Sequence, residues 1–323
     1  MNRILVTGGS GFIGSHLVEK LAALGYEVVC LVRPDSDLTW LEGLEVDYVV
    51  GDLTDPPSLA PAIQGADAVC HLAGQTRGRG FRAVNTAGTA NLVRIIREQG
   101  AGPKRFVFVS SLAAQGPGSG EAPLVESGPD RPVSAYGRSK LAAEKALANL
   151  PRKVALTVLR PPVVYGPRDE KSLDLVKMIR QGFLPLVRGP VQMISLLYVA
   201  DLVRALILAL EGTDTTGKFL LSDGECRSVR ELGTIIAGLL NTKVRSIPLP
   251  KVLLGAAALA SEGWSRLSGA EPAFGWDKFL EMGRPNWSVD CALARERLGF
   301  SPRYKPGQGF RETLRWYEDH GWL

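Results

Sequence analysis

Tyr136 and Lys140 are spaced four residues apart, and with Ser111 they are the residues best suited to catalysis in this sequence. On a helix, side chains at this spacing lie on one face, one turn apart. A tyrosine has an ordinary pKa of about 10 and is a poor base at neutral pH, but a neighbouring ammonium group favours its phenolate form. Ser111 stands at the end of an apolar run. Its hydroxyl could hydrogen-bond to the substrate oxygen with which Tyr136 exchanges a proton. The three residues therefore predict acid–base chemistry on a carbonyl or hydroxyl oxygen.

A glycine-rich loop near the N-terminus predicts a dinucleotide site. The loop follows an apolar strand and opens a helix. Gly9, Gly11 and Gly14 have the G-x-G-x-x-G spacing, and Gly8, Gly11 and Gly14 form a second, wider pattern. Such glycines let backbone N–H groups approach a pyrophosphate at the helix N-terminus; the alternative is a merely tight turn. An oxidised nicotinamide would add its positive charge to that of Lys140 and lower the pKa of Tyr136 further. The predicted contacts in this loop are Gly8, Gly9, Ser10, Gly11, Phe12, Ile13 and Gly14.

The end of the second strand indicates which dinucleotide binds. An acidic side chain there would bind the ribose hydroxyls of NAD, whereas an arginine accommodates the 2′-phosphate of NADP. The sequence Val32-Arg33-Pro34 places Arg33 at this position, followed by Asp35 and Asp37. We therefore expect NADP, with NAD as the alternative if Arg33 is only a solvated charge.

The elements that position these residues alternate between short β-branched runs and helical patterns. Strands are expected at 3–7, 27–32, 47–50, 68–72, 105–110 and 154–160, and helices near 12–24, 57–64, 82–99 and 134–149. Strands that are apolar on both faces are typical of a parallel sheet covered by helices on both sides. The predicted fold class is α/β, a doubly wound Rossmann domain.

The second half of the chain predicts a smaller, mostly helical substrate lobe. Helices are expected near 170–181, 199–211, 228–240 and 306–319, joined by proline-rich segments. We expect a dinucleotide-binding domain at 1–165 with a returning segment at about 191–224. The substrate lobe would then comprise 166–190 and 225–323.

The composition excludes several other classes of protein. The 323 residues include 38 Lys and Arg and 33 Asp and Glu, a net charge of +5 with no basic face that would indicate nucleic acid. The four cysteines and three histidines have no metal-ligand spacing, so we expect no metal and no disulfide framework. The apolar stretches 196–210 and 252–260 are too charged or too short to span a membrane. These features predict a cytoplasmic protein.

Taken together, these motifs resemble the extended short-chain dehydrogenase/reductase family, also called the NAD-dependent epimerase/dehydratase family. The resemblance covers essentially the whole chain and includes Gly51-Asp52-Leu53, His71-Leu72-Ala73-Gly74, Asn85, Arg160-Pro161-Pro162 and Tyr198-Val199-Ala200-Asp201-Leu202. It implies that Asp52 and Leu53 lie at the adenine, and that Lys140 contacts the nicotinamide ribose beside Tyr136. It further implies cofactor contacts from Leu72, Ala73, Gly74, Pro161 and Val163. It also implies a homodimer formed through helices 82–99 and 134–149; the alternative is that these are simply buried amphipathic helices.

Two departures from the family pattern concern the substrate. Val163 replaces the asparagine that contacts sugar nucleotides in many relatives, and the stretch 193–198 carries no charge. A diphosphate needs cationic or amide donors. The pattern looks more like 3β-hydroxysteroid dehydrogenases and dihydroflavonol reductases, which implies a reductase or dehydrogenase acting on a small-molecule ketone or secondary alcohol. A nucleotide-sugar epimerase or dehydratase with tightly bound cofactor, and a non-catalytic dinucleotide sensor, are the alternatives.

A short loop after the fourth strand carries three arginines, Arg77, Arg79 and Arg82. Ligands of open α/β sheets bind at this carboxyl edge, and the arginine fork suits carboxylates and phosphates. The loop predicts a site for an anionic group of the substrate; the alternative is an ordinary solvated loop.

Overall fold

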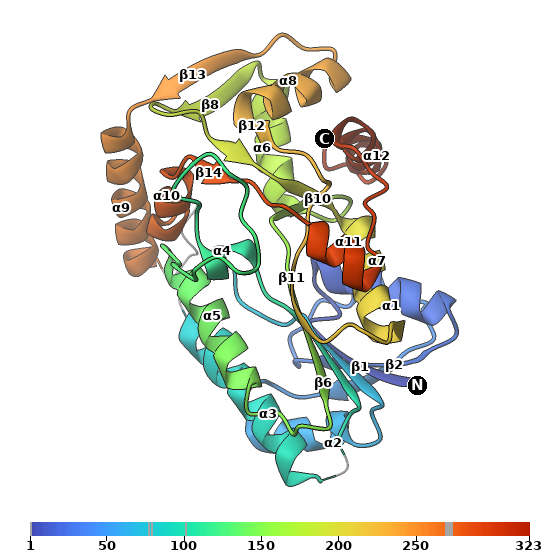
Figure 1. The fold of residues 1–323 in the computed structure, drawn as a ribbon. Coiled ribbons are helices and arrows are strands. Elements are labelled where there is room, and N and C mark those ends of the chain that lie inside the picture. The colour runs from blue at the N-terminus through green and yellow to red at the C-terminus, as the bar shows by residue number, and fades with distance from the viewer. Residues whose placement is uncertain (1, 77, 79, 101, 269–273) are drawn as a thin grey trace.

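Seven parallel strands form the central sheet of the computed structural model, which describes residues 2–76, 78, 80–100, 102–268 and 274–323 (Figure 1). The strand order is β11-β6-β5-β4-β1-β2-β3. The strands are β1 (Arg3–Thr7), β2 (Glu27–Val32), β3 (Asp47–Val50), β4 (Ala68–His71), β5 (Arg105–Val109), β6 (Ala155–Arg160) and β11 (Gly217–Leu220). The order reverses between β1 and β4, so the carboxyl ends of these two strands flank the crevice where such sheets bind ligands.

Helices cover both faces of this sheet, which is why its strands are apolar on both sides. Ile4 and Val6 of β1 pack into the core cluster on one face, while Leu5 between them packs into the cluster on the other. Figure 1 shows α1 (Phe12–Ala23) and α7 (Val199–Glu211) on one face, and α2 (Ala60–Ile63), α3 (Thr89–Glu98) and α5 (Ala135–Leu147) on the other. The predicted doubly wound fold is confirmed.

Two expected helices are less regular than the sequence pattern predicts. The segment expected at 57–64 consists of a 3₁₀ turn, Pro56–Leu59, followed by the four residues of α2. Pro56, Pro57 and Pro61 lack N–H donors, which limits regular α-helix there. The segment expected at 82–99 begins as a π-helical stretch, Arg82–Gly88, before α3. Such stretches often occur at functional sites.

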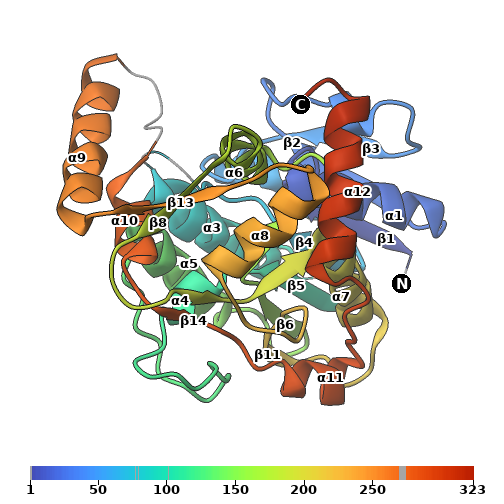
Figure 2. The same ribbon diagram turned by 90° about the horizontal axis from the view of Figure 1, so that it is seen from above.

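The C-terminal part of the chain is mostly helical and packs against the carboxyl end of the sheet (Figure 2). Its helices are α6 (Glu170–Arg180), α8 (Val229–Leu239), α9 (Lys251–Ser268), α10 (Trp276–Met282), α11 (Ala292–Leu298) and α12 (Pro306–Asp319). Three small sheets join them. They pair β7 (Val163–Tyr165) with β10 (Leu196–Tyr198), β8 (Phe183–Val187) with β13 (Arg245–Leu249), and β9 (Met193–Ile194) with β12 (Arg227–Ser228) and β14 (Asn286–Trp287).

Contacts between distant segments join the two parts of the chain. Asp201, in the first turn of α7, is fully buried and accepts hydrogen bonds from the backbone N–H groups of Arg303 and Tyr304. Residues 291–300, which lie within the predicted substrate lobe, contribute Cys291 and Phe300 to the core cluster on the α1 and α7 face of the sheet. In the described part of the chain, no helix is long and apolar enough to cross a membrane.

Candidate active site

The glycine loop forms a tight turn that a side chain would block. Gly8 has a φ of +73°, and a Cβ there would lie 2.6 Å from the backbone nitrogen of Ala73. A Cβ on Gly14 would lie 1.9 Å from the carbonyl oxygen of Gly8. The loop ends at Gly11, the N-cap of α1, and none of the described side chains caps this helix end. The first N–H groups of α1 are therefore available to a pyrophosphate, and the cradle fits a dinucleotide.

A buried hydrogen-bond chain holds the ends of β1 and β4 together beside this loop. The His71 Nδ1 atom lies 2.7 Å from the Thr7 hydroxyl, and its Nε2 atom lies 2.9 Å from the Thr89 hydroxyl. Burial lowers the pKa of His71 to about 3, with a further lowering from Lys140. His71 is therefore neutral, and it orders the strand ends next to Ala73, whose N–H donates to Thr7.

The remaining cofactor candidates line the same edge of the sheet. The Leu53 carbonyl accepts a hydrogen bond from Asn91, and the Leu72 N–H donates to the carbonyl of Thr7. The Pro161 carbonyl accepts a hydrogen bond from the N–H group of Leu112, 2.9 Å away. Val163, at the start of β7, is half-exposed.

Arg33 and Asp52 lie together at the ends of β2 and β3. Arg33 is 58% exposed and pairs with Asp35 at 3.2 Å. Hydrogen bonds from Thr54 lower the pKa of Asp52, and the charge of Arg33 lowers it further. A surface pair such as Arg33–Asp35 contributes little stability, so Arg33 can exchange this partner for a phosphate at small cost.

Lys140 lies where β4 and β5 end. Its Nζ atom donates to the Val109 carbonyl at 2.9 Å and lies over the Phe108 ring, 4.8 Å from the centroid. A Cβ on Gly74 would meet Nζ at 3.1 Å, so glycine leaves room for the ammonium group beside the end of β4. Burial lowers the pKa of Lys140 to about 8, although Glu144 raises it.

Tyr136 and Ser111 are brought together by close packing of α5 against α4 (Leu112–Gln115). A Cβ on Gly137 would lie 2.2 Å from the Ala113 carbonyl oxygen, so only glycine allows this approach. Ser111 is the N-cap of α4, and its hydroxyl also hydrogen-bonds to Tyr136. The ring of Phe81 packs edge-on against Tyr136, with centroids 5.9 Å apart. Tyr136, Ser111 and Lys140 thus lie at the same edge of the sheet as the glycine loop.

The pKa of Tyr136 differs from the sequence-based expectation. Burial raises it to about 12, the hydrogen bond with Ser111 lowers it, and the charge of Glu281 raises it. The expectation that Lys140 lowers this pKa is therefore wrong for the protein's own groups. The physical reason is that burial dominates, while the Lys140 ammonium is directed to the Val109 carbonyl.

Two carboxylates of α10 contact the start of α5, and sequence reasoning missed both. Asp277 accepts hydrogen bonds from the N–H groups of Ala135 and Tyr136, at 2.8 and 2.9 Å. Glu281 accepts one from the Ser134 hydroxyl at 2.7 Å, and burial raises its own pKa. These contacts join residues more than 140 positions apart, and no local pattern indicates them.

Sequence reasoning also missed a buried ion network behind the site. Arg160 is fully buried; it binds both oxygens of Glu144 at 2.8 and 2.6 Å, and Asp130 at 2.6 Å. Glu144 also accepts a hydrogen bond from Ser110. The network holds the end of β6 against α5. Removing one partner of such a network leaves a buried charge unpaired.

The arginine loop is described only in part. Arg77 and Arg79 lie outside the described residues, and Arg82 is exposed at the start of the π-helical stretch. Nearby, Asn85 binds the backbone N–H and carbonyl of Gln75 and donates to the Ser139 hydroxyl. The asparagine therefore fixes the loop to α5.

This combination of fold and site defines a dinucleotide-dependent Rossmann protein with a Tyr-x-x-x-Lys pair. The model of the NAD dependent epimerase/dehydratase family matches residues 4–220. The chain belongs to this family, as its motifs indicated.

The curated relatives that it resembles include reductases and an epimerase. It is 31% identical to the ceramide reductase of Caulobacter vibrioides, across 99% of this chain and 96% of that protein. It is 29% identical to the 2-alkyl-3-oxoalkanoate reductase of Stenotrophomonas maltophilia (96% and 97% covered) and 28% identical to the UDP-glucose 4-epimerase of Vibrio cholerae (96% and 94%).

The expected likeness to 3β-hydroxysteroid dehydrogenases and dihydroflavonol reductases is confirmed. The relatives include a 3-beta-hydroxysteroid dehydrogenase of Mycolicibacterium neoaurum, 29% identical, and a putative dihydroflavonol 4-reductase of Synechocystis, 27% identical. Among solved structures, gox2253 superposes with a TM-score of 0.81 at 27% identity, with 99% of both chains covered.

Proposed function

We propose that this protein is an NAD(P)-dependent oxidoreductase that interconverts a small-molecule ketone and its secondary alcohol. The observation that carries the proposal is the convergence of Tyr136, Ser111 and Lys140 beside the glycine cradle. A general acid, a second hydrogen-bond donor and a cation are what carbonyl reduction requires around one oxygen.

Each residue has a distinct proposed role. The bound nicotinamide would supply or accept the hydride. Tyr136 donates its hydroxyl proton to the substrate oxygen in reduction, and accepts a proton from it in oxidation. Ser111 hydrogen-bonds to the same oxygen, and the Lys140 ammonium would contact the nicotinamide ribose of the bound cofactor. The N-terminus of α1 and the backbone of Gly8–Gly14 hold the pyrophosphate.

The substrate that we propose is an apolar carbonyl compound rather than a sugar nucleotide, because β10 supplies no charged donor for a diphosphate. Leu196, Leu197 and Tyr198 of β10 are buried and uncharged. Arg227 of the adjoining small sheet is already paired with Asp223 at 2.8 Å and with Glu225. A diphosphate would have to displace such pairs. The relatives named as reductases of ceramide and of 2-alkyl-3-oxoalkanoates support the same class.

NADP is the proposed cofactor, with NAD as the alternative. Arg33 follows the second strand at the position that meets the adenine ribose in this fold. Its exposed guanidinium could pair with a 2′-phosphate in place of Asp35.

Replacing Tyr136 with phenylalanine tests the mechanism. Tyr136→Phe keeps the ring but removes the proton, so kcat on an identified ketone should fall by about 10²–10⁴-fold. Cofactor affinity should change little, which distinguishes loss of proton transfer from loss of the site. Near-normal turnover of Tyr136→Phe would contradict the proposal.

The second candidate function, an epimerase or dehydratase, is favoured by the likeness to the Vibrio cholerae 4-epimerase. Such an enzyme regenerates its cofactor within each turnover and keeps it bound. Absorbance of the purified protein distinguishes the two: cofactor that survives purification and gel filtration favours the epimerase, whereas cofactor that exchanges freely favours the oxidoreductase.

A further inference from the structure

Helix α9 directs its large apolar side chains outward. Val252, Leu253, Leu259, Trp264 and Leu267 are 58–85% exposed, and of the helix only Gly255 and Ala258 are buried. The gaps between these positions are one, six, five and three residues, and with 3.6 residues per turn all five fall within an arc of about 140° on one side of the helix. An amphipathic helix of a water-soluble lobe normally turns such a stripe toward the core.

The side of α9 that faces the protein carries small and polar residues together with the partly buried Leu254. A Cβ on Gly255 would lie 3.3 Å from the ring of Phe279 in α10. Ser261 and Glu262 accept hydrogen bonds from the N–H groups of Phe274 and Trp276, at 3.3 and 2.8 Å. The polar side chains are therefore used to attach α9 to the molecule. Figure 2 shows the helix at one edge, beside α10.

Exposed cations lie near this apolar stripe. Arg188, Lys251, Arg266 and Arg284 are exposed and form no ion pair in the part of the chain that the structure describes. Lys251 and Arg284 line one shallow surface depression, and Arg188 donates its N–H to Leu249 just before α9. The acidic residue of α9, Glu262, is turned inward.

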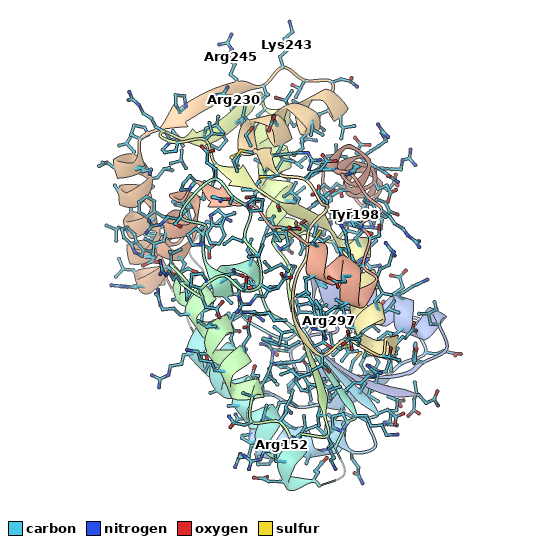
Figure 3. The ribbon with its side chains drawn as sticks, viewed as in Figure 1. Arg152, Tyr198, Arg230, Lys243, Arg245 and Arg297 are labelled. Carbon is cyan, nitrogen blue, oxygen red and sulfur yellow. The ribbon has the colours of Figure 1, made fainter. Side chains whose placement is uncertain are left out.

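Further cations lie along the same lobe. Figure 3 shows Lys243 and Arg245 pointing away from the molecule at the end where β13 begins. Arg230 of α8 lies beside this strand and donates to the Ser246 hydroxyl at 3.0 Å. These cations lie on the lobe that carries α9, at the end of β13 remote from that helix.

We propose that α9 docks in the surface of a membrane that contains anionic lipids. Apolar side chains on one side of a helix, an aromatic residue such as Trp264 and flanking cations match a helix lying in the plane of the interface. Exposed apolar surface of this kind marks an interaction site. Anionic headgroups complement the unpaired cations, and a helix in this orientation need not span the bilayer.

The docked orientation would bring the candidate active site close to the membrane. Helix α9 packs on α10, and α10 in turn contacts the start of α5 through Asp277 and Glu281, next to Tyr136. An apolar ketone could then pass from the lipid phase to the site without crossing water. The docking surface itself does not depend on the reaction proposed above.

Vesicle co-sedimentation of the full chain tests the docking. Wild type should bind vesicles of phosphatidylcholine mixed with phosphatidylglycerol more tightly than vesicles of phosphatidylcholine alone. The triple variant Leu253→Ser, Trp264→Ser, Leu267→Ser should bind at least about a thousandfold more weakly, because each of the three side chains contributes about tenfold or more when the membrane buries it. Val50→Ser is the matched control, since Val50 is 62% exposed on β3, in the sheet. This control should bind like wild type.

A second variant isolates the charge contribution. Lys251→Gln with Arg284→Gln should weaken binding to the anionic vesicles by about fivefold per charge and leave binding to neutral vesicles unchanged. The thermal midpoints of both variants should match wild type, because every replaced side chain is exposed.

Two results would overturn the proposal: wild type sediments with neither kind of vesicle, or the triple variant binds as tightly as wild type. In the first case, sedimentation velocity identifies what covers the helix instead. A wild-type dimer that the triple variant dissociates would show that a second copy of the chain covers α9.

Discussion

Replacing Lys140 with methionine should stabilise the protein at neutral pH while abolishing turnover. Lys140 is 4% exposed, and burial lowers its pKa from 10.5 to about 8. Each pKa unit corresponds to about 1.4 kcal/mol, so the buried charge costs about 3 kcal/mol of unfolding free energy at pH 7. Methionine fills similar space without a charge, but the hydrogen bond to the Val109 carbonyl is lost at a cost of about 1 kcal/mol. The net gain should be about 2 kcal/mol.

The pH dependence of this difference identifies its cause. Between about pH 8 and 10.5 the unfolded state holds the Lys140 proton more tightly than the folded state, so the stability of wild type rises with pH in that window. Lys140→Met lacks that rise, and its advantage should shrink or reverse by pH 10. Guanidinium unfolding followed by tryptophan fluorescence at pH 7 and pH 10 measures both values. Lys145→Met, an exposed position on the same helix, is the control. A parallel pH dependence in Lys140→Met and wild type would refute the reasoning.

Three other changes test separate parts of the site. Wild type should bind NADP about tenfold to a hundredfold more tightly than NAD, and Arg33→Ala should lose that preference in calorimetric titrations; equal wild-type affinities would contradict the assignment. Gly14→Ala should weaken cofactor binding by at least about tenfold because its Cβ has no room, whereas Gly238→Ala, which meets nothing within 4 Å, should leave binding unchanged. Glu281→Gln removes a negative charge that raises the pKa of Tyr136, so the alkaline rise of alcohol oxidation should shift to lower pH; an unchanged profile would count against this coupling.

Local sequence patterns were sufficient for six of the seven strands of the central sheet, whereas β11 was not predicted as a strand. The strands β1, β2 and β3 begin and end at the predicted residues, because β-branched runs bounded by polar or glycine residues leave few alternatives. The spacing of Tyr136 and Lys140 likewise follows from helix geometry alone. The proximity of Ser111 is different: it depends on the close packing of α4 and α5 at Gly137, which only tertiary structure reveals. The roles of these residues in the reaction stay predictions.

The sequence could not predict features that depend on long-range contacts. Nothing near Asp277 or Glu281 indicates that α10 reaches the start of α5. The apolar stretch within α9 is visible in the sequence, but the side that faces water is decided by Gly255 against Phe279. A pattern of apolar residues indicates a helix face and leaves open whether that face meets the core or an external surface. The pKa of Tyr136 is set in the same way, by burial that no local pattern reports.

The opposite pKa shifts of Tyr136 and Lys140 bear on the direction of the reaction. Burial disfavours the charged form of each group, so the pKa of the phenol rises to about 12 and that of the amine falls to about 8. At neutral pH, Tyr136 is then an intact acid, ready to donate a proton to an alkoxide as a ketone is reduced. Oxidation of an alcohol would require Tyr136 to lose its proton first. Burial opposes this deprotonation, whereas a positive charge next to the phenol would favour it. We therefore infer that the protein's own groups favour carbonyl reduction near neutral pH and that alcohol oxidation gains as pH rises.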